Sequence, residues 1–233
     1  NYRIEKIFNL YLNLAFIIAL IALFQQFSYL VGFEYGYDFM GNEILDARYN
    51  WDEDKRIWEP NSKRERSFNR LGQRIEEVAY EWDKIMESWY KAWKLEWGFD
   101  SLGNKTSEVM YNKSYDGPKW KRFVKKEYTY DTLSNITAEL SYYWNEDLKS
   151  WDGDTKDVFF YDSSDNQILH IFYGWNREEL WYKIKKMEYS YDTSGNQVLK
   201  KLSWLNNKGK WDKDYKYESV YDSSGNKIHW QYY

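Results

Sequence analysis

The sequence predicts an all-β protein, an antiparallel β-meander built of about seven hairpin repeats of 30–31 residues each. The first supporting observation is an aromatic residue that recurs every 30 or 31 residues, at Tyr37, Phe68, Phe99, Tyr130, Tyr161, Tyr191 and Tyr221. The second is that the segments between these positions alternate apolar and polar side chains, which is typical of half-buried strands. The third is the composition, because the 233 residues include 14 Trp and 24 Tyr, and aromatic residues favour strands.

Each repeat begins at a turn, and four of these turns have Asp in the first position and Gly in the fourth. This pattern predicts a type I turn closed by a left-handed residue, as in hairpin loops with a Gly bulge. The structural turn residues are therefore Asp38 and Gly41, Asp100 and Gly103, Asp192 and Gly195, and Asp222 and Gly225. In two repeats Ser134 and Asp165 replace the Gly, and we expect those turns to be strained or shifted.

Two strands follow each turn, and a Trp lies at each end of the loop that joins them, except in the third repeat, where Lys113 interrupts the first series. The first strand ends at Trp51, Trp82, Trp144, Trp175 and, one place early, Trp204. The second strand begins at Trp58, Trp89, Trp120, Trp151, Trp181 or Trp211. Antiparallel pairing would bring the two rings together, where aromatic pairs contribute about 0.5–1 kcal/mol.

The alternation also predicts two different sheet faces. Trp89, Lys91, Trp93, Leu95, Trp97 and Phe99 share one parity, and a Lys-x-Glu pair such as Lys94/Glu96 recurs on the other. We therefore expect an aromatic face and a solvated, charged face on a meander of 14 strands. Sheet twist should curl this meander into a solenoid-like spiral with its aromatic face inward, and a closed barrel is the alternative.

The N-terminal segment differs from the repeats. Residues 10–24 form the only long apolar run, and Arg3 and Lys6 precede it. The run is short for a membrane span of about 20 residues and resembles the apolar region of a secretory signal. We expect residues 1–26 to be a helical signal peptide or membrane anchor, with a buried helix as a third possibility. Residues 27–233 would form a single repeat array, secreted or on the outer cell surface, touching a membrane only through residues 10–24 if these are uncleaved.

The turn sequences at residues 191–196 and 221–226, Tyr-Asp-x-x-Gly-Asn, resemble the YD repeats of bacterial Rhs-like proteins. They are also similar to the aromatic β-hairpin repeats of bacterial surface proteins. The resemblance covers residues 27–233 but rests on the turn motif, because the repeat is longer here and adds the paired Trp. It implies a secreted or cell-surface protein whose hairpins spiral into a shell and serve toxin delivery or surface interaction. It supplies no catalytic residue.

The residue types in the sequence give little support for a catalytic site, a cofactor or a metal site. His170 and His229 lie in different repeats and there is no Cys, so neither a zinc site nor a His-based triad is expected. The carboxylates occupy repeated positions, whereas a catalytic pair should interrupt the repeat. Residues 152–157 are rich in Asp and raise the alternative of a calcium loop, although a solvated polar loop is the simpler interpretation. We expect a non-enzymatic protein with no cofactor and no metal.

The aromatic excess leaves two interpretations, packing between strands or a platform for sugar rings. The candidate ligand-binding residues are Trp58, Trp89, Trp93, Trp97, Trp120, Trp151, Trp181 and Trp211, of which Trp89, Trp93 and Trp97 form the richest cluster in the sequence. The net charge of −4 shows no basic stripe and disfavours a nucleic-acid partner. We expect an exported binding protein with a glycan or protein partner. The alternative is a structural or spacer subunit of a larger secreted or envelope assembly, which docks edge to edge through an open strand.

Overall fold

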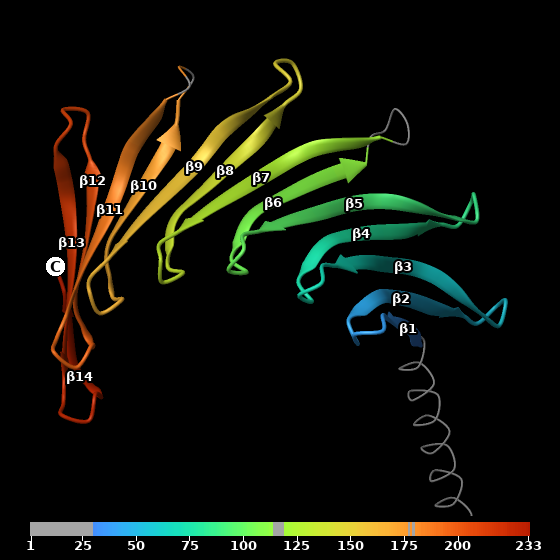
Figure 1. Ribbon diagram of the computed structural model, residues 1–233, viewed down its shortest axis with the longest axis horizontal. Helices are drawn as coiled ribbons and strands as arrows, with labels where there is room; N and C mark the ends of the chain where they lie inside the picture. Colours follow the sequence, from blue (N-terminus) through green and yellow to red (C-terminus); the bar gives the residue numbers. More distant parts are fainter. Residues whose placement is uncertain (1–29, 114–118, 177, 179) are drawn as a thin grey trace, which may run out of the picture. The chain divides into compact units, whose positions relative to one another are not determined.

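A computed structural model of the protein describes residues 30–113, 119–176, 178 and 180–233. These residues form 14 strands (Figure 1). The strands are β1 (Val31–Tyr37), β2 (Glu43–Asp52), β3 (Ile57–Phe68), β4 (Arg74–Asp83), β5 (Ser88–Phe99), β6 (Lys105–Lys113), β7 (Trp120–Tyr130), β8 (Ile136–Asn145), β9 (Ser150–Tyr161), β10 (Gln167–Trp175), β11 (Trp181–Tyr191), β12 (Gln197–Leu205), β13 (Trp211–Tyr221) and β14 (Lys227–Tyr232). The described part contains no helix long and apolar enough to cross a membrane. The expected signal peptide or anchor, residues 1–26, lies outside the described residues.

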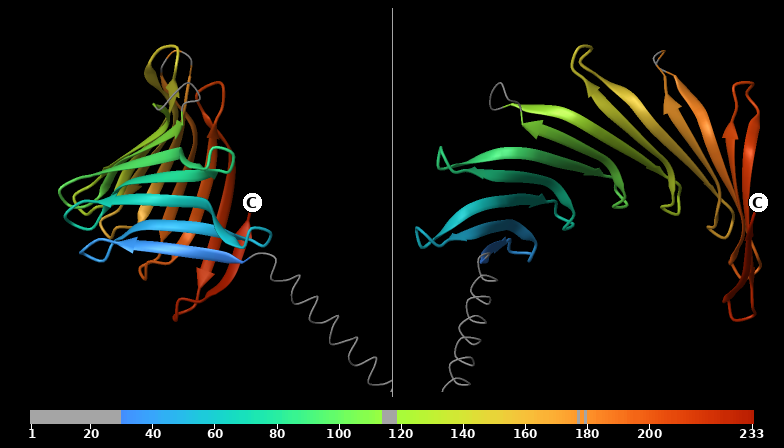
Figure 2. Two further views of the ribbon diagram at one scale, coloured as in Figure 1. Left: turned by 90° about the vertical axis from the view of Figure 1, so that its right-hand side faces the viewer. Right: turned by 180° about the vertical axis from the view of Figure 1, so that it is seen from behind.

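The strands form an antiparallel meander, as the sequence predicts. Their order in the sheet is the order of the chain, from β1 to β14. Both β1 and β14 pair with a single described strand, so the described sheet is open and does not have the closed-barrel arrangement. The chain divides into two compact units, residues 1–92 and 93–233, and the boundary falls inside β5. Within each unit, consecutive strands lie side by side in both views of Figure 2.

The turns share one set of hydrogen bonds, seen clearly at Asp192. The Gly195 N–H donates to the Asp192 carbonyl at 3.0 Å, and the Asp192 N–H donates to the Asn196 carbonyl at 3.0 Å. The Asp192 Oδ1 accepts the N–H groups of Ser194 and Asn196, both at 2.9 Å. Equivalent bonds occur at Asp38, Asp100 and Asp222. The following Gly residues have positive φ, with values of 84° at Gly41, 90° at Gly103, 82° at Gly195 and 79° at Gly225.

The two turns without Gly keep this geometry, so the expected shift is absent. Ser134 has a φ of 67° and Asp165 a φ of 61°, both in the left-handed region. The Ser134 N–H still donates to the Asp131 carbonyl, at 3.2 Å. An L-residue with a side chain is held there at a cost of about 1–2 kcal/mol, so the strain is local to one residue.

Tyrosine hydroxyls connect neighbouring hairpins in the second unit. The Tyr161 hydroxyl donates to the Ile136 carbonyl at 2.9 Å, and the Tyr191 hydroxyl donates to the Gln167 carbonyl at 2.9 Å. Tyr130 and Tyr221 make the equivalent bonds to Lys105 and Gln197. The recurrent Tyr before the turn Asp therefore fastens each turn to the start of the preceding strand.

Because the strands contain β-bulges, the predicted division into an aromatic face and a charged face is wrong. β3, β7, β9, β11 and β13 each contain an irregular step in their pairing with the preceding strand. In β7, Arg122 pairs with Tyr111 and Val124 pairs with Met110, so Phe123 is the extra residue. One extra residue reverses the parity of everything beyond it. Trp120 and Lys125 consequently share a face despite their opposite parity, and the aromatic and charged faces are not separate.

The sheet encloses almost no hydrophobic core. Among the described residues, the buried apolar side chains are Ala47, Val78 and Ala79. Most Trp and Tyr rings are half-buried against neighbouring strands instead. Stability therefore depends on contacts between sequence neighbours along the array, and many rings keep a solvent-facing surface.

Candidate binding surface

One face of the sheet, here called the ladder face, carries the recurrent Lys-x-Glu pairs. The Lys63 Nζ lies 2.6 Å from a Glu65 oxygen, and the Lys125 Nζ lies 2.8 Å from a Glu127 oxygen. Equivalent pairs form between Lys94 and Glu96, Lys186 and Glu188, and Lys216 and Glu218. Each pair satisfies its own charge, so these groups provide little net charge for a partner.

Four of these five Lys side chains also lie against aromatic rings of the following strands. The Lys125 Nζ is 4.4 Å from the Tyr142 ring centroid and 5.4 Å from that of Trp151. The same arrangement places Lys63 over Tyr80 and Trp89, and Lys94 over Tyr111 and Trp120. Lys186 lies over Trp211. At these distances each cation–π contact contributes about 0.5–1 kcal/mol. Each such Lys and the rings around it are here called a cage. In these cages a Lys of the protein already covers one ring face of Trp89, Trp120, Trp151 and Trp211.

A tyrosine–glutamate bond completes the cages of Lys63 and Lys94. The Tyr80 hydroxyl donates to Glu65 at 2.8 Å, and the Tyr111 hydroxyl donates to Glu96 at 2.6 Å. Burial, followed by the bond to Glu65, raises the pKa of Tyr80 to about 12. Burial acts to raise the pKa of Glu65, but the hydrogen bonds from Lys63 and Tyr80 outweigh it and hold that pKa below its usual value. The Tyr stays protonated and the Glu ionised near neutral pH, so the pair has no proton to exchange.

Where Trp residues stand at both ends of a loop, the two rings pack edge to face. The ring centroids are 5.3 Å apart in Trp51–Trp58, 5.2 Å in Trp82–Trp89, 5.2 Å in Trp144–Trp151 and 4.7 Å in Trp175–Trp181. Trp58 is the most open of these rings, at 46% exposed. The arrangement explains why the two Trp positions recur, since each pair closes one end of a hairpin.

Of the three Trp residues in β5 expected to form a cluster, Trp93 and Trp97 lie on the face opposite Lys94, as their parity predicts. Lys94 pairs with Tyr111, whereas its neighbour Trp93 pairs with Asn112 and so lies on the opposite face. The Trp97 Nε1 donates to Glu108 at 3.0 Å, also on that face. Trp89 belongs to the first unit, with its Trp82 partner.

Sequence reasoning missed a row of rings on the face opposite the ladder in β12–β14. This aromatic row consists of Trp204, Tyr215, Tyr232 and Tyr217. Centroid separations along it are 5.4 Å, 5.7 Å and 4.8 Å. The three Tyr are exposed, by 39% at Tyr215 and Tyr217 and 48% at Tyr232. The available signal was the position of Trp204, one place before the repeat predicts.

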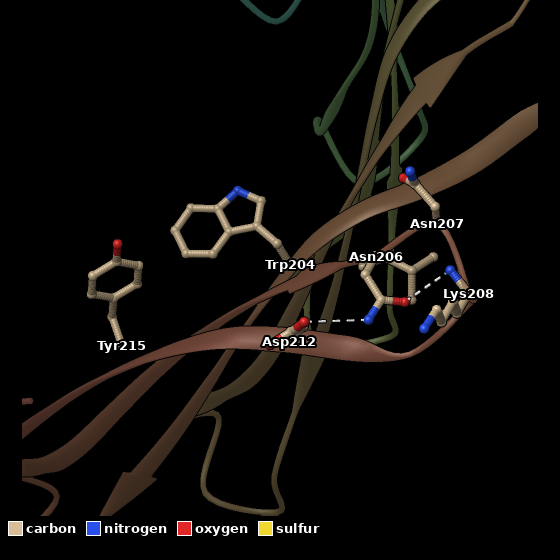
Figure 3. Close-up of a pocket in the computed structure, with 7 residues that line it drawn as sticks. Trp204, Asn206, Asn207, Lys208, Asp212 and Tyr215 are labelled. Carbon is tan, nitrogen blue, oxygen red and sulfur yellow. Dashed lines mark hydrogen bonds between the residues drawn. The ribbon is translucent and has the colours of Figure 1, made fainter.

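Hollows lie at both ends of the aromatic row. The first, of about 740 Å³, is lined by Trp204, Leu205, Asn206, Asn207, Lys208, Asp212 and Tyr215 (Figure 3). The second, of about 370 Å³, is lined by Gln197, Lys200, Tyr217, Glu218, Ser219, Lys227 and Trp230. Both combine aromatic rings with amide and charged groups, which is the lining expected of a site for a polar ligand with apolar faces.

No three His, Asp or Glu side chains converge on a metal position in the described part of the chain. His170 bonds to Asp157 through its Nε2 and stacks on Phe159 at 4.6 Å. Residues 152–157, considered above as a calcium loop, are part of strand β9. There Asp154 accepts a hydrogen bond from Ser141 at 2.8 Å, and Asp152 accepts one from Asn145 at 2.7 Å.

Comparison with known proteins gives no family for the chain. No family model matches it, and no curated protein matches its sequence. Among solved structures, it is similar to a DUF3836 family protein from Bacteroides vulgatus, with 18% identity and a TM-score of 0.32 over 39% of this chain and 90% of the other. It is also similar to a protein of unknown function from Bacteroides fragilis, with 14% identity and a TM-score of 0.27 over 70% and 95% of the two chains. The Photorhabdus luminescens Tc holotoxin pore gives 11% identity and a TM-score of 0.35 over 87% of this chain and 14% of the other. Similarities this small carry no conclusion about function.

Proposed function

We propose that the protein is an exported, non-enzymatic repeat protein that binds glycans through aromatic side chains on an open β-sheet. The observation that carries this proposal is the aromatic row, where exposed rings lie beside hollows lined by polar groups. The apolar faces of sugar rings stack on Trp and Tyr, and sugar hydroxyls bond to the amide and charged groups beside them.

The remaining parts of the proposal come from the sequence. The apolar run at residues 10–24 supports export, and the Tyr-Asp turns support a YD-type array of about seven repeats at a bacterial cell surface. Sheet twist supports a curled, solenoid-like arrangement of the repeats. Of the eight Trp residues singled out from the sequence, the exposed ring of Trp58 is the best placed to contact a ligand, because the cages occupy Trp89, Trp120, Trp151 and Trp211.

The test is a titration of the full-length chain with soluble neutral and acidic polysaccharides, followed by Trp fluorescence and checked by pull-down. We expect a saturable change in fluorescence with at least one polysaccharide class. Heat-unfolded protein serves as the control for non-specific adhesion. Absence of binding to every polysaccharide, together with co-purification of a protein partner, would contradict the glycan proposal.

A structural role is the second candidate, and strand β14 favours it. Ile228 and Trp230 in this strand are 63% and 65% exposed. An exposed strand edge with large apolar side chains can accept another strand. Light scattering of the full-length chain distinguishes the two candidates, since a spacer subunit associates without glycan, whereas a monomer at every concentration would exclude self-association.

A further inference from the structure

Three consecutive positions in β12 depart together from the repeat. Ser203 stands where Tyr80, Tyr111, Tyr142 and Tyr173 recur, and Leu205 takes the place opposite Trp211 that Trp175 takes opposite Trp181. Trp204 lies between them and therefore faces the other side of the strand. The Ser203 side chain is fully buried and its Oγ has no hydrogen-bond partner. Compared with most of the other repeats, β12 therefore lacks the Trp pair and the Tyr hydroxyl on the ladder face. It carries an indole ring on the opposite face instead.

The displaced indole forms a corner with Tyr215. Their ring planes meet at 77°, and Figure 3 shows both rings rising from β12 and β13 on the same side. Asn206 and Asp212 lie between these rings and the turn, joined by a 3.3 Å hydrogen bond from Asn206 Nδ2 to Asp212 Oδ2. A flat ring with polar edges fits such a corner, because one indole face supports it while the amide and carboxylate meet its hydroxyls.

The charges beside the aromatic row favour an acidic ligand. Lys208 lines the first hollow, and Lys200 and Lys227 line the second. The carboxylates of the two hollows are already bonded to donors, Asp212 to Asn206 and Glu218 to Lys216 and Gln231. Lysine ammonium groups are thus present at both ends of the row, and the Glu218 carboxylate near the second hollow is paired with Lys216.

From this arrangement we propose that the aromatic row binds an acidic glycan, a chain of sugar rings that carry carboxylate groups. This inference rests on the proposed function and gives it a site and a ligand class. One sugar ring occupies the corner of Trp204 and Tyr215, with its carboxylate toward Lys208. The chain continues past Tyr232 and Tyr217 to the second hollow. The net charge of −4 disfavours single-stranded nucleic acid, which also stacks on aromatic rings but requires a positive groove along its backbone.

The experiment measures binding of the full-length chain to an acidic probe, oligogalacturonate, and to its neutral methyl ester. We expect the ester to bind more weakly than the acid. Trp204→Ala and Tyr215→Ala should each raise the Kd for the acid by about 10-fold or more, as expected for loss of a stacking ring. Lys208→Gln should weaken binding of the acid and leave binding of the ester unchanged.

The matched controls are residues of the same types that do not belong to the row. Tyr143→Ala removes an exposed Tyr of β8 that contacts Phe123, and Lys210→Gln changes a Lys in the turn of Lys208. Both should bind the probe as the unaltered protein does. Circular dichroism and the unfolding midpoint identify any variant that has lost its fold, and Tyr215→Phe then replaces Tyr215→Ala and should retain stacking.

The possible outcomes distinguish a failure of this inference from a failure of the proposed function. If folded Trp204→Ala and Tyr215→Ala bind the acid as before while Trp58→Ala does not, the protein binds glycans elsewhere and the inference is wrong. If acid and ester bind equally, the acidic ligand class is wrong. If single-stranded DNA competes fully at the same site, the ligand class is also wrong. If no polysaccharide binds the unaltered protein, the proposed function itself fails.

Discussion

The backbone angle at the fourth position of each turn determines how much strain the turn carries. Ser134 is held at a φ of 67°, in the position that Gly occupies in the turns at Gly103 and Gly195. Because its side chain disfavours this region, Ser134→Gly should stabilise the protein by about 0.5–1 kcal/mol, even though Gly adds freedom to the unfolded chain. The urea midpoint of unfolding, followed by circular dichroism, measures the change.

Leu133 provides the control in the same turn, since its φ is not positive. There Gly removes no strain and only loosens the unfolded chain, so Leu133→Gly should destabilise the protein. Gly195→Ser should also destabilise, because it introduces the strain that Ser134 carries. Equal effects of Ser134→Gly and Leu133→Gly would contradict this account.

The residues that set the turns could be predicted from the sequence, whereas those of the aromatic row could not. The turn Asp and Gly act within a few residues of each other, so local chemistry specifies them. Trp204, Tyr215 and Tyr232 come together only through pairing of three strands, and two of them lie outside the recurrent Trp positions. The offset of Trp204 was visible in the sequence, but its consequence depends on the face that it occupies.

At the scale of the strand, the bulge explains why the faces were predicted wrongly. Parity predicts a face only while every residue has a partner across the ladder. Phe123 in β7 has no partner in β6, so the alternation of faces is reversed on passing this residue. Trp120 therefore lies on the same face as Lys125. Nothing in the alternation of side chains marks that position, because a bulge is a property of the paired strands. The strands and their order follow from the sequence, and the composition of each face follows from the bulges.

The turns as a group make stability dependent on pH. Hydrogen bonds from Asn196 hold the pKa of Asp192 below its usual value, and bonds from Asn166 do the same for Asp162. The pKa of Asp38, Asp100, Asp131 and Asp222 is lowered in the same way. A lowered folded-state pKa contributes stability that is present above the unfolded pKa of 3.8 and is lost as the pH falls through the folded pKa. The urea midpoint of unfolding should therefore decrease when the pH is lowered below about 4.

The turn at Asn69 shows how to test the origin of this effect. Asn69 Oδ1 accepts the N–H groups of Leu71 and Gln73, at 2.9 and 3.0 Å, with no ionisable side chain. Asp162→Asn should therefore keep its turn and reduce the acid sensitivity of the unfolding midpoint. Asn69→Asp should increase that sensitivity. An unchanged pH profile in both variants would show that the turns are not responsible.

Close packing of one ring on a strand predicts a second effect at this scale. The Trp175 ring lies over Gly153 in β9, where an added Cβ would be 2.4 Å from the Trp175 Cδ2. Gly153→Ala should destabilise the protein by about 1–3 kcal/mol through overpacking. In the Trp175→Ala background the same change should cost much less, and the double-mutant cycle measures the coupling. Additive effects would show that the ring moves aside freely.

At the scale of the whole molecule, the near absence of a hydrophobic core among the described residues makes stability a property of neighbouring hairpins. Each strand of the described sheet contacts the strands before and after it in the sequence. Cages, Trp pairs and Tyr hydroxyl bonds all join adjacent strands or hairpins. Such an array opens locally, and a defect should spread only as far as its neighbours.

Hydrogen exchange tests this locality with Tyr161→Phe, which removes the bond to the Ile136 carbonyl and keeps the ring. Loss of the bond should cost about 0.5–1.5 kcal/mol, and Phe68 and Phe99 show that the repeat accepts Phe at this position. In a neighbour-stabilised array, faster exchange should be confined to β8, β9 and the strands beside them, while β12 and β13 keep their protection. Exchange that accelerates equally in all the strands would instead require a single cooperative unit, and the neighbour-based account of stability would be wrong.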